Sequence, residues 1–275
     1  MIELIQELLS YNFIVRALIV GIMVALCSAL LGVSLVLKRY SMIGDGLSHV
    51  GFGALSIAMA MNLAPLQVSV PIVVLAAFLL LRISESSKIK GDAAIALISS
   101  SSIAIGVIVT SITTGLNTDV CNFLFGSILA MSKGDVYLSI GLSIIVLVLF
   151  IFFYNKIFAV TFDEGFARAI GTKAGVYNML IALLTAVTIV VGMRIMGALL
   201  ISSLIIFPAL SSMRIFRSFK IVIISSAVIS VICFFWGTVA SYAFDTPAGA
   251  SIVAVNMVVF FACCLIGLVP RSEKE

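Results

Sequence analysis

The chain has 275 residues, of which 63% are hydrophobic and only 10% charged, and its mean hydropathy is +1.31. A soluble globular domain has roughly 25% charged residues, so this composition excludes that class and predicts an all-α, polytopic membrane protein. Its long continuous apolar runs exclude an outer-membrane barrel, and its net charge of +4, without a basic patch interleaved with aromatics, predicts no nucleic-acid partner.

Nine apolar runs are long enough to cross a bilayer, which takes roughly 17 to 25 residues. They are Phe13–Leu37, Met42–Asn62, Leu66–Arg82, Ala93–Leu116, Val136–Tyr154, Val176–Met193, Ile195–Met213, Ile221–Phe244 and Ala248–Val269. Eight crossings remain an alternative if the stretch Val176–Met213 is miscounted. Val120–Met131 is apolar but too short to cross, which predicts a short or re-entrant helix surrounded by protein or a water-filled cavity. Without a linker or internal repeat, residues 1–275 form one domain.

The basic residues predict the orientation of the chain. With the N-terminus outside, thirteen of the sixteen Lys and Arg residues lie on the inner side, and only Arg16, Lys133 and Arg194 lie outside. We therefore expect the N-terminus outside and the C-terminus in the cytoplasm. The first residues include Glu3 and Glu7 rather than a basic region, so they do not resemble a signal peptide.

The second run places an aspartate and the chain's single histidine inside an apolar segment. On a helix, Asp45 and His49 are one turn apart on the same face. This face forms a polar stripe typical of a cation pathway, consisting of Ser41, Asp45, Ser48, His49 and Ser56. The small residues that leave room for a close neighbour are Gly44, Gly46, Gly51 and Gly53.

An ionisable residue inside a membrane helix costs at least ~2.5 kcal/mol, which makes the pair a functional hypothesis. A carboxylate with an imidazole suits zinc or manganese better than an alkali cation. Two ligands are too few for a closed site, so a homodimer with this helix near its axis, or water, would complete it. The alternative is architectural: Asp45 lies seven residues beyond Lys38, where it could cap the helix, and His49 could bond a neighbouring helix.

The longest polar interruption, Asn155–Gly175, is predicted to be cytoplasmic, and its centre reads as a short amphipathic helix. Acidic residues Asp163 and Glu164 come first, and basic residues Arg168 and Lys173 follow, as the helix dipole prefers. One face is apolar and consists of Phe162, Phe166, Ala169 and Ile170. Two interpretations are open, a helix lying on the bilayer surface or a docking element for a cytoplasmic partner.

Two later segments have a specialised composition. Gly197–Ser212 combines small residues with Pro208 in mid-span, the pattern of a kinked, closely packed helix. Ala243–Ser251 places Asp245 at a helix start with Pro247 inside the first turn. Physics alone favours plain architecture for both. The five cysteines show no metal-site or redox spacing and are interpreted as small hydrophobic residues.

The motifs of several enzyme classes are missing from the sequence. There is no GxxxxGK[ST] phosphate loop, no HExxH and no GxSxG, and a single histidine leaves most hydrolase schemes incomplete. An intramembrane enzyme built on Asp45 is a rival hypothesis, but it needs a second carboxylate at membrane depth. The other acids fall in loops or at helix ends. We therefore expect a transporter subunit without an ATPase site of its own.

Five segments, in order along nearly the whole chain, resemble the membrane permease subunits of ABC importers for zinc and manganese. They are GDGLSHVGFG from Gly44, Gly91–Val107, Asn122–Asp135, Met196–Phe216 and the FDTPAGAS segment. The third is also similar to a short helix of cobalamin and siderophore permeases. The FDTPAG form is closer to the zinc permeases, so zinc is expected first and manganese (or iron) second. A permease for a metal chelate is a further alternative.

The resemblance implies a homodimer in a prokaryotic plasma membrane, surrounded by lipid, with two cytoplasmic ATPase subunits that bind ATP and an external metal-binding protein. It implies alternating access, with Asp45 and His49 as ligands of the transported divalent metal and with no cofactor of the chain's own. It also identifies the region 162–173, including Gly171, as the coupling helix seated in a groove of the ATPase.

Overall fold

The computed structural model describes residues 6–7, 10–86, 91–113, 124, 126, 132–198 and 200–268. Every regular element in these ranges is a helix, as the composition predicts. The predicted short helix at Val120–Met131 lies outside the described residues except for positions 124 and 126, so its re-entrant form stays a prediction.

Seven of the described helices are long and apolar enough to cross a membrane. They are α2 (Asn12–Leu37), α4 (Pro65–Ser86), α5 (Gly91–Thr113), α7 (Lys133–Phe152), α10 (Ala174–Met196), α12 (Phe219–Phe244) and α13 (Ala248–Leu268). Two further helices, α3 (Ser41–Ala60) and α11 (Ile201–Ile215), match predicted spans but are not among the seven. α11 has only 15 residues, and the glycines and two ionisable residues of α3 lower its hydropathy.

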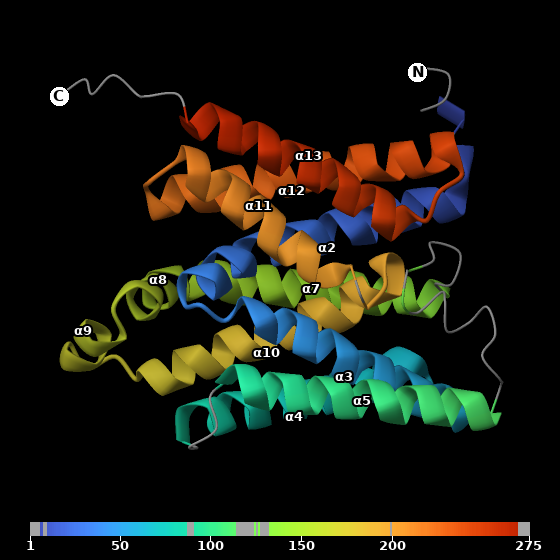
Figure 1. Ribbon diagram of the computed structural model, residues 1–275, viewed down its shortest axis with the longest axis horizontal. Coiled ribbons are helices and arrows are strands. Elements are labelled where there is room, and N and C mark those ends of the chain that lie inside the picture. The colour runs from blue at the N-terminus through green and yellow to red at the C-terminus, as the bar shows by residue number, and fades with distance from the viewer. Residues whose placement is uncertain are drawn as a thin grey trace.

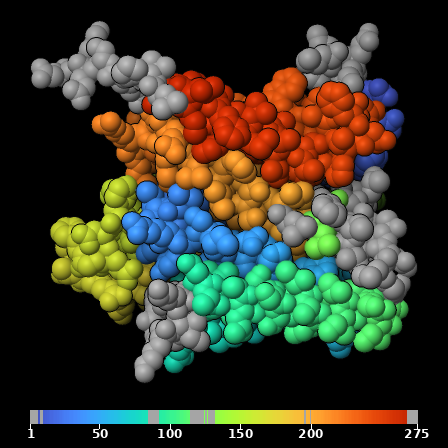
Figure 2. Space-filling model, viewed as in Figure 1, coloured from blue at the N-terminus to red at the C-terminus, as the bar shows by residue number. Residues whose placement is uncertain are grey.

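The long helices lie roughly side by side in a bundle (Figure 1). α12 and α13 form one edge and α3, α4 and α5 the opposite edge, with α2, α10 and α11 between them. α2 packs on α7, α10, α11 and α12, and its buried face supplies much of the hydrophobic core. Two short helices, α8 (Tyr154–Phe162) and α9 (Glu164–Ala169), project from one end as a separate lobe (Figure 2).

Glycines let α3 pack closely against its neighbours, as the sequence predicts. A Cβ added to Gly53 would lie 2.8 Å from the backbone oxygen of Ser102 on α5, and one added to Gly46 would lie 2.7 Å from Cγ2 of Ile95. Both distances are too short for a real methyl group. The helix that carries Asp45 and His49 is therefore held against α5 by backbone contact.

The break between α10 and α11 differs from the prediction. The sequence placed it at Arg194, between two apolar runs, whereas α10 continues to Met196 and ends at Gly197, whose φ is +90°. Arg194 lies in the last turn of α10 and is buried. It pairs with Asp135 of α7 at 3.1 Å, so burial in this ion pair explains why a basic residue occurs inside the helix.

Residues near the C-terminus correct a second prediction. Asp245 does not start a helix: it ends α12 in the left-handed conformation, with a φ of +52°. Pro247 directly precedes α13 and does not lie inside its first turn. At this corner the Ser241 hydroxyl donates to the backbone oxygen of Thr246 at 2.6 Å, and the Thr246 and Ser251 side chains bond each other at 2.7 Å. Pro208 does lie inside α11, as predicted.

Candidate functional site

Asp45 and His49 lie together on α3, as the four-residue spacing predicts. The Nε2 atom of His49 is 3.5 Å from Oδ2 of Asp45. Ser202, near the start of α11, lies beside the carboxylate. The pair therefore lies where α3 faces α11, two helices that are distant in the sequence.

The two side chains differ in their surroundings. The Asp45 side chain is 38% exposed, whereas that of His49 is 10% exposed. Nδ1 of His49 is buried and has no hydrogen-bond partner among the described residues. An unpaired buried nitrogen costs free energy, and such groups in native structures need an explanation. A metal-ligating imidazole usually bonds a second group through its other nitrogen, and the described residues supply no such group to Nδ1 of His49.

Two serines of the predicted polar stripe bond their own helix. Ser48 donates its hydroxyl to the backbone oxygen of Asp45 at 2.7 Å, and Ser56 donates to that of Phe52 at 2.9 Å. Each hydroxyl uses its proton in this bond and keeps its oxygen lone pairs as acceptors. Asp45 and His49 are the ionisable members of the stripe.

A single chain supplies an incomplete metal site. Across the ranges that the structure describes, no group of three or more His, Cys, Asp and Glu side chains is close enough to hold a metal ion. One carboxylate oxygen and one imidazole nitrogen still form a donor set suited to zinc or manganese. The remaining ligands would come from water or a second copy, as expected for two ligands per chain.

The short helix predicted in the coupling region is present as α9, and α8 ends just before it at Phe162. Asp163 separates the two helices, and its carboxylate caps α9 by accepting from the backbone N–H of Phe166 at 2.8 Å. Gly171, with a φ of +81°, turns the chain after α9. Only Ala167 of α9 is buried. The predicted apolar face is exposed and consists of Phe162, Phe166, Ala169 and Ile170. One edge of it meets α12, because the rings of Phe162 and Phe219 lie 5.5 Å apart between centroids.

Sequence reasoning missed two contributors to these regions. Ser202 comes 157 residues after Asp45, and a serine in an apolar run gives no signal of that contact. Lys38 was counted only as an inner-side cation, yet its ammonium bonds residues of α8, α9 and α10. These partners are 122 to 140 residues away in the sequence.

Residues 10–267 match the model of the ABC 3 transport family. The chain is 30% identical over 273 residues to the manganese import system permease protein ScaB of Streptococcus gordonii, covering 99% of this chain and 98% of ScaB. It is 28% identical over 251 residues to the high-affinity zinc uptake system membrane protein ZnuB of Haemophilus influenzae, covering 91% of this chain and 96% of ZnuB.

The fold is also similar to that of a solved structure, PsaBC from Streptococcus pneumoniae in complex with Fab. The TM-score is 0.86 at 30% identity, and the match covers 96% of this chain and 95% of the other. The likeness therefore extends over nearly the whole chain.

Proposed function

The chain belongs to the ABC 3 transport family, and from this membership we propose that it is the permease subunit of an ATP-driven importer of divalent metal ions. The observation that carries the proposal is the Asp45–His49 pair, in which a partly exposed carboxylate lies 3.5 Å from a buried imidazole. A pathway must bind its ion weakly enough to release it, and an incomplete ligand set meets that requirement.

The transported ion is proposed to be manganese or zinc. The FDTPAG motif puts zinc first, but the chain is 30% identical to a protein named for manganese import and 28% identical to one named for zinc uptake. These identities give no preference. A mixed oxygen and nitrogen donor pair is compatible with both ions.

The proposed assembly contains two copies of the chain, two cytoplasmic ATPase subunits and an external metal-binding protein. The exposed apolar side chains at α9 support a docking role, because Phe166 is 61% and Ile170 56% exposed. ATP hydrolysis is assigned to the partner subunits. The basic residues favour a plasma-membrane orientation with the N-terminus outside and the lobe of α8 and α9 in the cytoplasm.

Alternating access follows from this assembly. Closure of the ATPase pair would push α9, and rearrangement of the helices would open the Asp45–His49 pair first to one side and then to the other. The carboxylate and imidazole would offset part of the ion's desolvation while it crosses. Substituting either residue should abolish transport without preventing insertion into the membrane.

The test is uptake of radioactive zinc and manganese, in competition, by proteoliposomes that hold the chain with its ATPase and binding protein. We compare the native chain with His49→Ala and, as a control, Ser56→Ala, which lies on the same helix and bonds its own backbone. ATP-dependent uptake of either ion that requires His49 but not Ser56 supports the proposal. Uptake of a metal chelate alone, or of neither ion, would contradict it.

A further inference from the structure

Lys38 lies at the turn that joins α2 to α3. It is the C-terminal cap of α2, and the backbone N–H groups of the next two residues bond back into that helix: Arg39 to Val36 at 3.1 Å, and Tyr40 to Leu35 at 2.8 Å. Arg39 is left-handed, with a φ of +60°. These bonds form a Schellman motif, which fixes the path of the chain after a helix. The position of Lys38 is therefore set by its own backbone, three residues before α3 begins.

The Lys38 side chain joins three other helices. Its ammonium nitrogen lies 3.1 Å from the backbone oxygen of Val160 at the end of α8, 3.4 Å from Oε2 of Glu164 in α9 and 2.5 Å from Oδ1 of Asn178 in α10. Asn178 also donates to the same Glu164 oxygen at 3.1 Å, which closes a triangle. An ammonium group has three donors, so it can serve all three acceptors at once.

The surroundings of this cluster keep both charges in place. The side chain of Lys38 is only 7% exposed. Burial raises the pKa of the Glu164 carboxyl, but hydrogen bonds from Asn178 and Arg168 and the charges of Lys38 and Arg168 outweigh it, so the pKa lies below its ordinary value. The carboxylate is therefore ionised at neutral pH, and the ion pair forms a charged link between α2 and α9.

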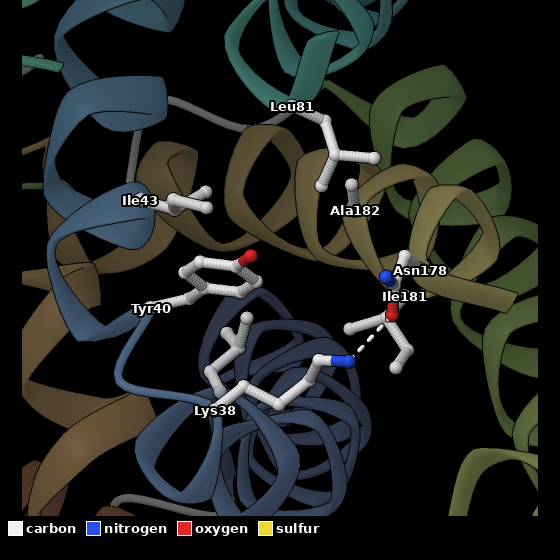
Figure 3. Close-up of a pocket in the computed structure, with 8 residues that line it drawn as sticks. Lys38, Tyr40, Ile43, Leu81, Asn178, Ile181 and Ala182 are labelled. Atoms are coloured by element: carbon white, nitrogen blue, oxygen red, sulfur yellow. Dashed lines mark hydrogen bonds between the residues drawn. The ribbon is translucent and has the colours of Figure 1, made fainter. Parts of the chain in front are cut away.

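A small pocket of about 10 Å³, about enough for one water molecule, lies beside the cluster (Figure 3). The Lys38 side chain extends along the pocket to Asn178 of α10. Tyr40 and Ile43, at the beginning of α3, lie on the side of the pocket opposite α10. Leu81 of α4 closes another wall. The beginning of α3 therefore lies close to α4, α10 and Lys38 around this small pocket.

We propose that Lys38 is a positioning residue that ties the docking helix α9 to the beginning of α3, and so passes a displacement of α9 to the Asp45–His49 pair. This inference rests on the proposed function. Lys38 is seven residues from Asp45 and is followed by a fixed turn, while its side chain contacts α9 directly. No other described side chain makes an ion pair between α9 and the segment that leads into α3.

A purely architectural role for Lys38 predicts a different outcome from a linking role. If the cluster only stabilised the fold, its loss would lower ATP hydrolysis and metal uptake together. If it transmits movement, the ATPase still docks and turns over, but less metal crosses for each ATP hydrolysed. The ratio of uptake to hydrolysis therefore separates the two roles.

The experiment uses the complete complex in proteoliposomes and measures both rates in the same vesicles with the ion that the native complex transports. The variants are Lys38→Met, which removes the charge, and Lys38→Arg, whose planar guanidinium keeps the charge but not the geometry. Lys156→Met, at an exposed lysine of α8, is the matched control. The bound ATPase is quantified by co-purification.

We expect Lys38→Met to retain the ATPase and its hydrolysis while uptake per ATP falls at least about tenfold, within the usual range of coupling between sites. The uptake per ATP of Lys38→Arg should lie between the values of Lys38→Met and the native chain, and that of Lys156→Met should equal the native value. An unchanged ratio in Lys38→Met, with native transport intact, overturns the inference and leaves the proposed function standing. Absence of ATP-dependent uptake by the native complex overturns both.

If Lys38→Met does not accumulate in the membrane, the ratio of uptake to hydrolysis is measured with Lys38→Arg and Asn178→Leu instead. Asn178→Leu keeps the ion pair but removes its bond to α10. A ratio below the native value in these variants supports the inference, and a native ratio in both overturns it.

Discussion

Two charged clusters in this molecule are built in opposite ways. In α3, Asp45 and His49 contact each other, but the carboxylate stays partly exposed and one imidazole nitrogen has no partner among the described residues. At the end of α2, Lys38 reaches three acceptors, and its two side-chain partners, Glu164 and Asn178, also bond each other. The first cluster has unused ligand capacity, and the second is closed.

The difference follows from what buried polar groups cost. A charged network repays its desolvation only when its members find partners, as at Lys38. A group that is left unsatisfied costs free energy unless something else fills the gap. We therefore infer that the closed cluster holds the helices together and links their movements, whereas the open pair binds a ligand.

The largest effect is expected at the open pair. Asp45→Ala should lower metal uptake by about 100-fold or more. Loss of a residue that only hydrogen-bonds a metal ligand already lowers metal affinity or activity by about 10- to 100-fold, and Asp45 is proposed to be a ligand itself. Thermal unfolding of the purified chain should change little, since the side chain is 38% exposed. Uptake and unfolding are measured on the same preparation. A large loss of stability in Asp45→Ala without loss of uptake would show that Asp45 stabilises the fold and does not bind the metal.

The comparison also requires α3 to hold its pair rigidly. Gly53→Val should destabilise the chain by about 1–3 kcal/mol, as overpacking does, because its Cβ would meet the Ser102 backbone at 2.8 Å. Gly141→Val is the matched control, since nothing lies within 4 Å of a Cβ at that position of α7. Thermal unfolding in detergent measures both. Equal losses in the two variants would show that close approach of α3 and α5 is unimportant.

A smaller effect is expected at the closed cluster. Glu164→Ala leaves the buried Lys38 ammonium without its counter-charge, and we expect a loss of about 1–3 kcal/mol, below the range for fully buried pairs because Glu164 is partly exposed. Arg168→Ala, at an exposed partner of the same carboxylate, should cost less than about 1 kcal/mol. If thermal unfolding ranks the two variants the other way, Lys38 is not the dominant partner.

The smallest effect is a pH dependence. The folded-state pKa of Glu164 lies below its ordinary value of 4.5, so its contribution to stability is present above pH 4.5 and is lost as the pH falls through the folded-state pKa. The difference in melting temperature between the native chain and Glu164→Gln should persist from pH 7 to 4.5 and shrink at lower pH. A difference that vanishes above pH 4.5 would contradict the ion pair.

Most of the fold could be predicted from local patterns in the sequence. The ends of α2 and α12 lie within two residues of the predicted spans, because apolar runs bounded by polar residues define them directly. The sequence places the break at Arg194 and not at Gly197, because the apolar residues continue through Gly197 and a charge usually ends a span. Arg194 stays inside the helix because it pairs with a residue 59 positions away in the sequence. Hydropathy does not register either feature.

The candidate site was predicted only where it is local. Asp45 and His49 meet because they are one turn apart, so spacing alone identified them. The spacing does not show that Ser48 and Ser56 donate their hydroxyls to backbone oxygens of their own helix. The Lys38 cluster joins segments more than 120 residues apart, and no pattern in a single sequence indicates such a contact.

The most direct test of the account is the X-ray absorption spectrum of zinc bound to the purified chain in detergent. We predict an imidazole nitrogen at about 2.0–2.1 Å from the metal, together with oxygen ligands, because His49 and Asp45 are the donors. This nitrogen signal should be absent in His49→Ala and retained in Ser56→Ala. A shell without imidazole in the native chain, or one unchanged by His49→Ala, would show that the pair does not bind the ion.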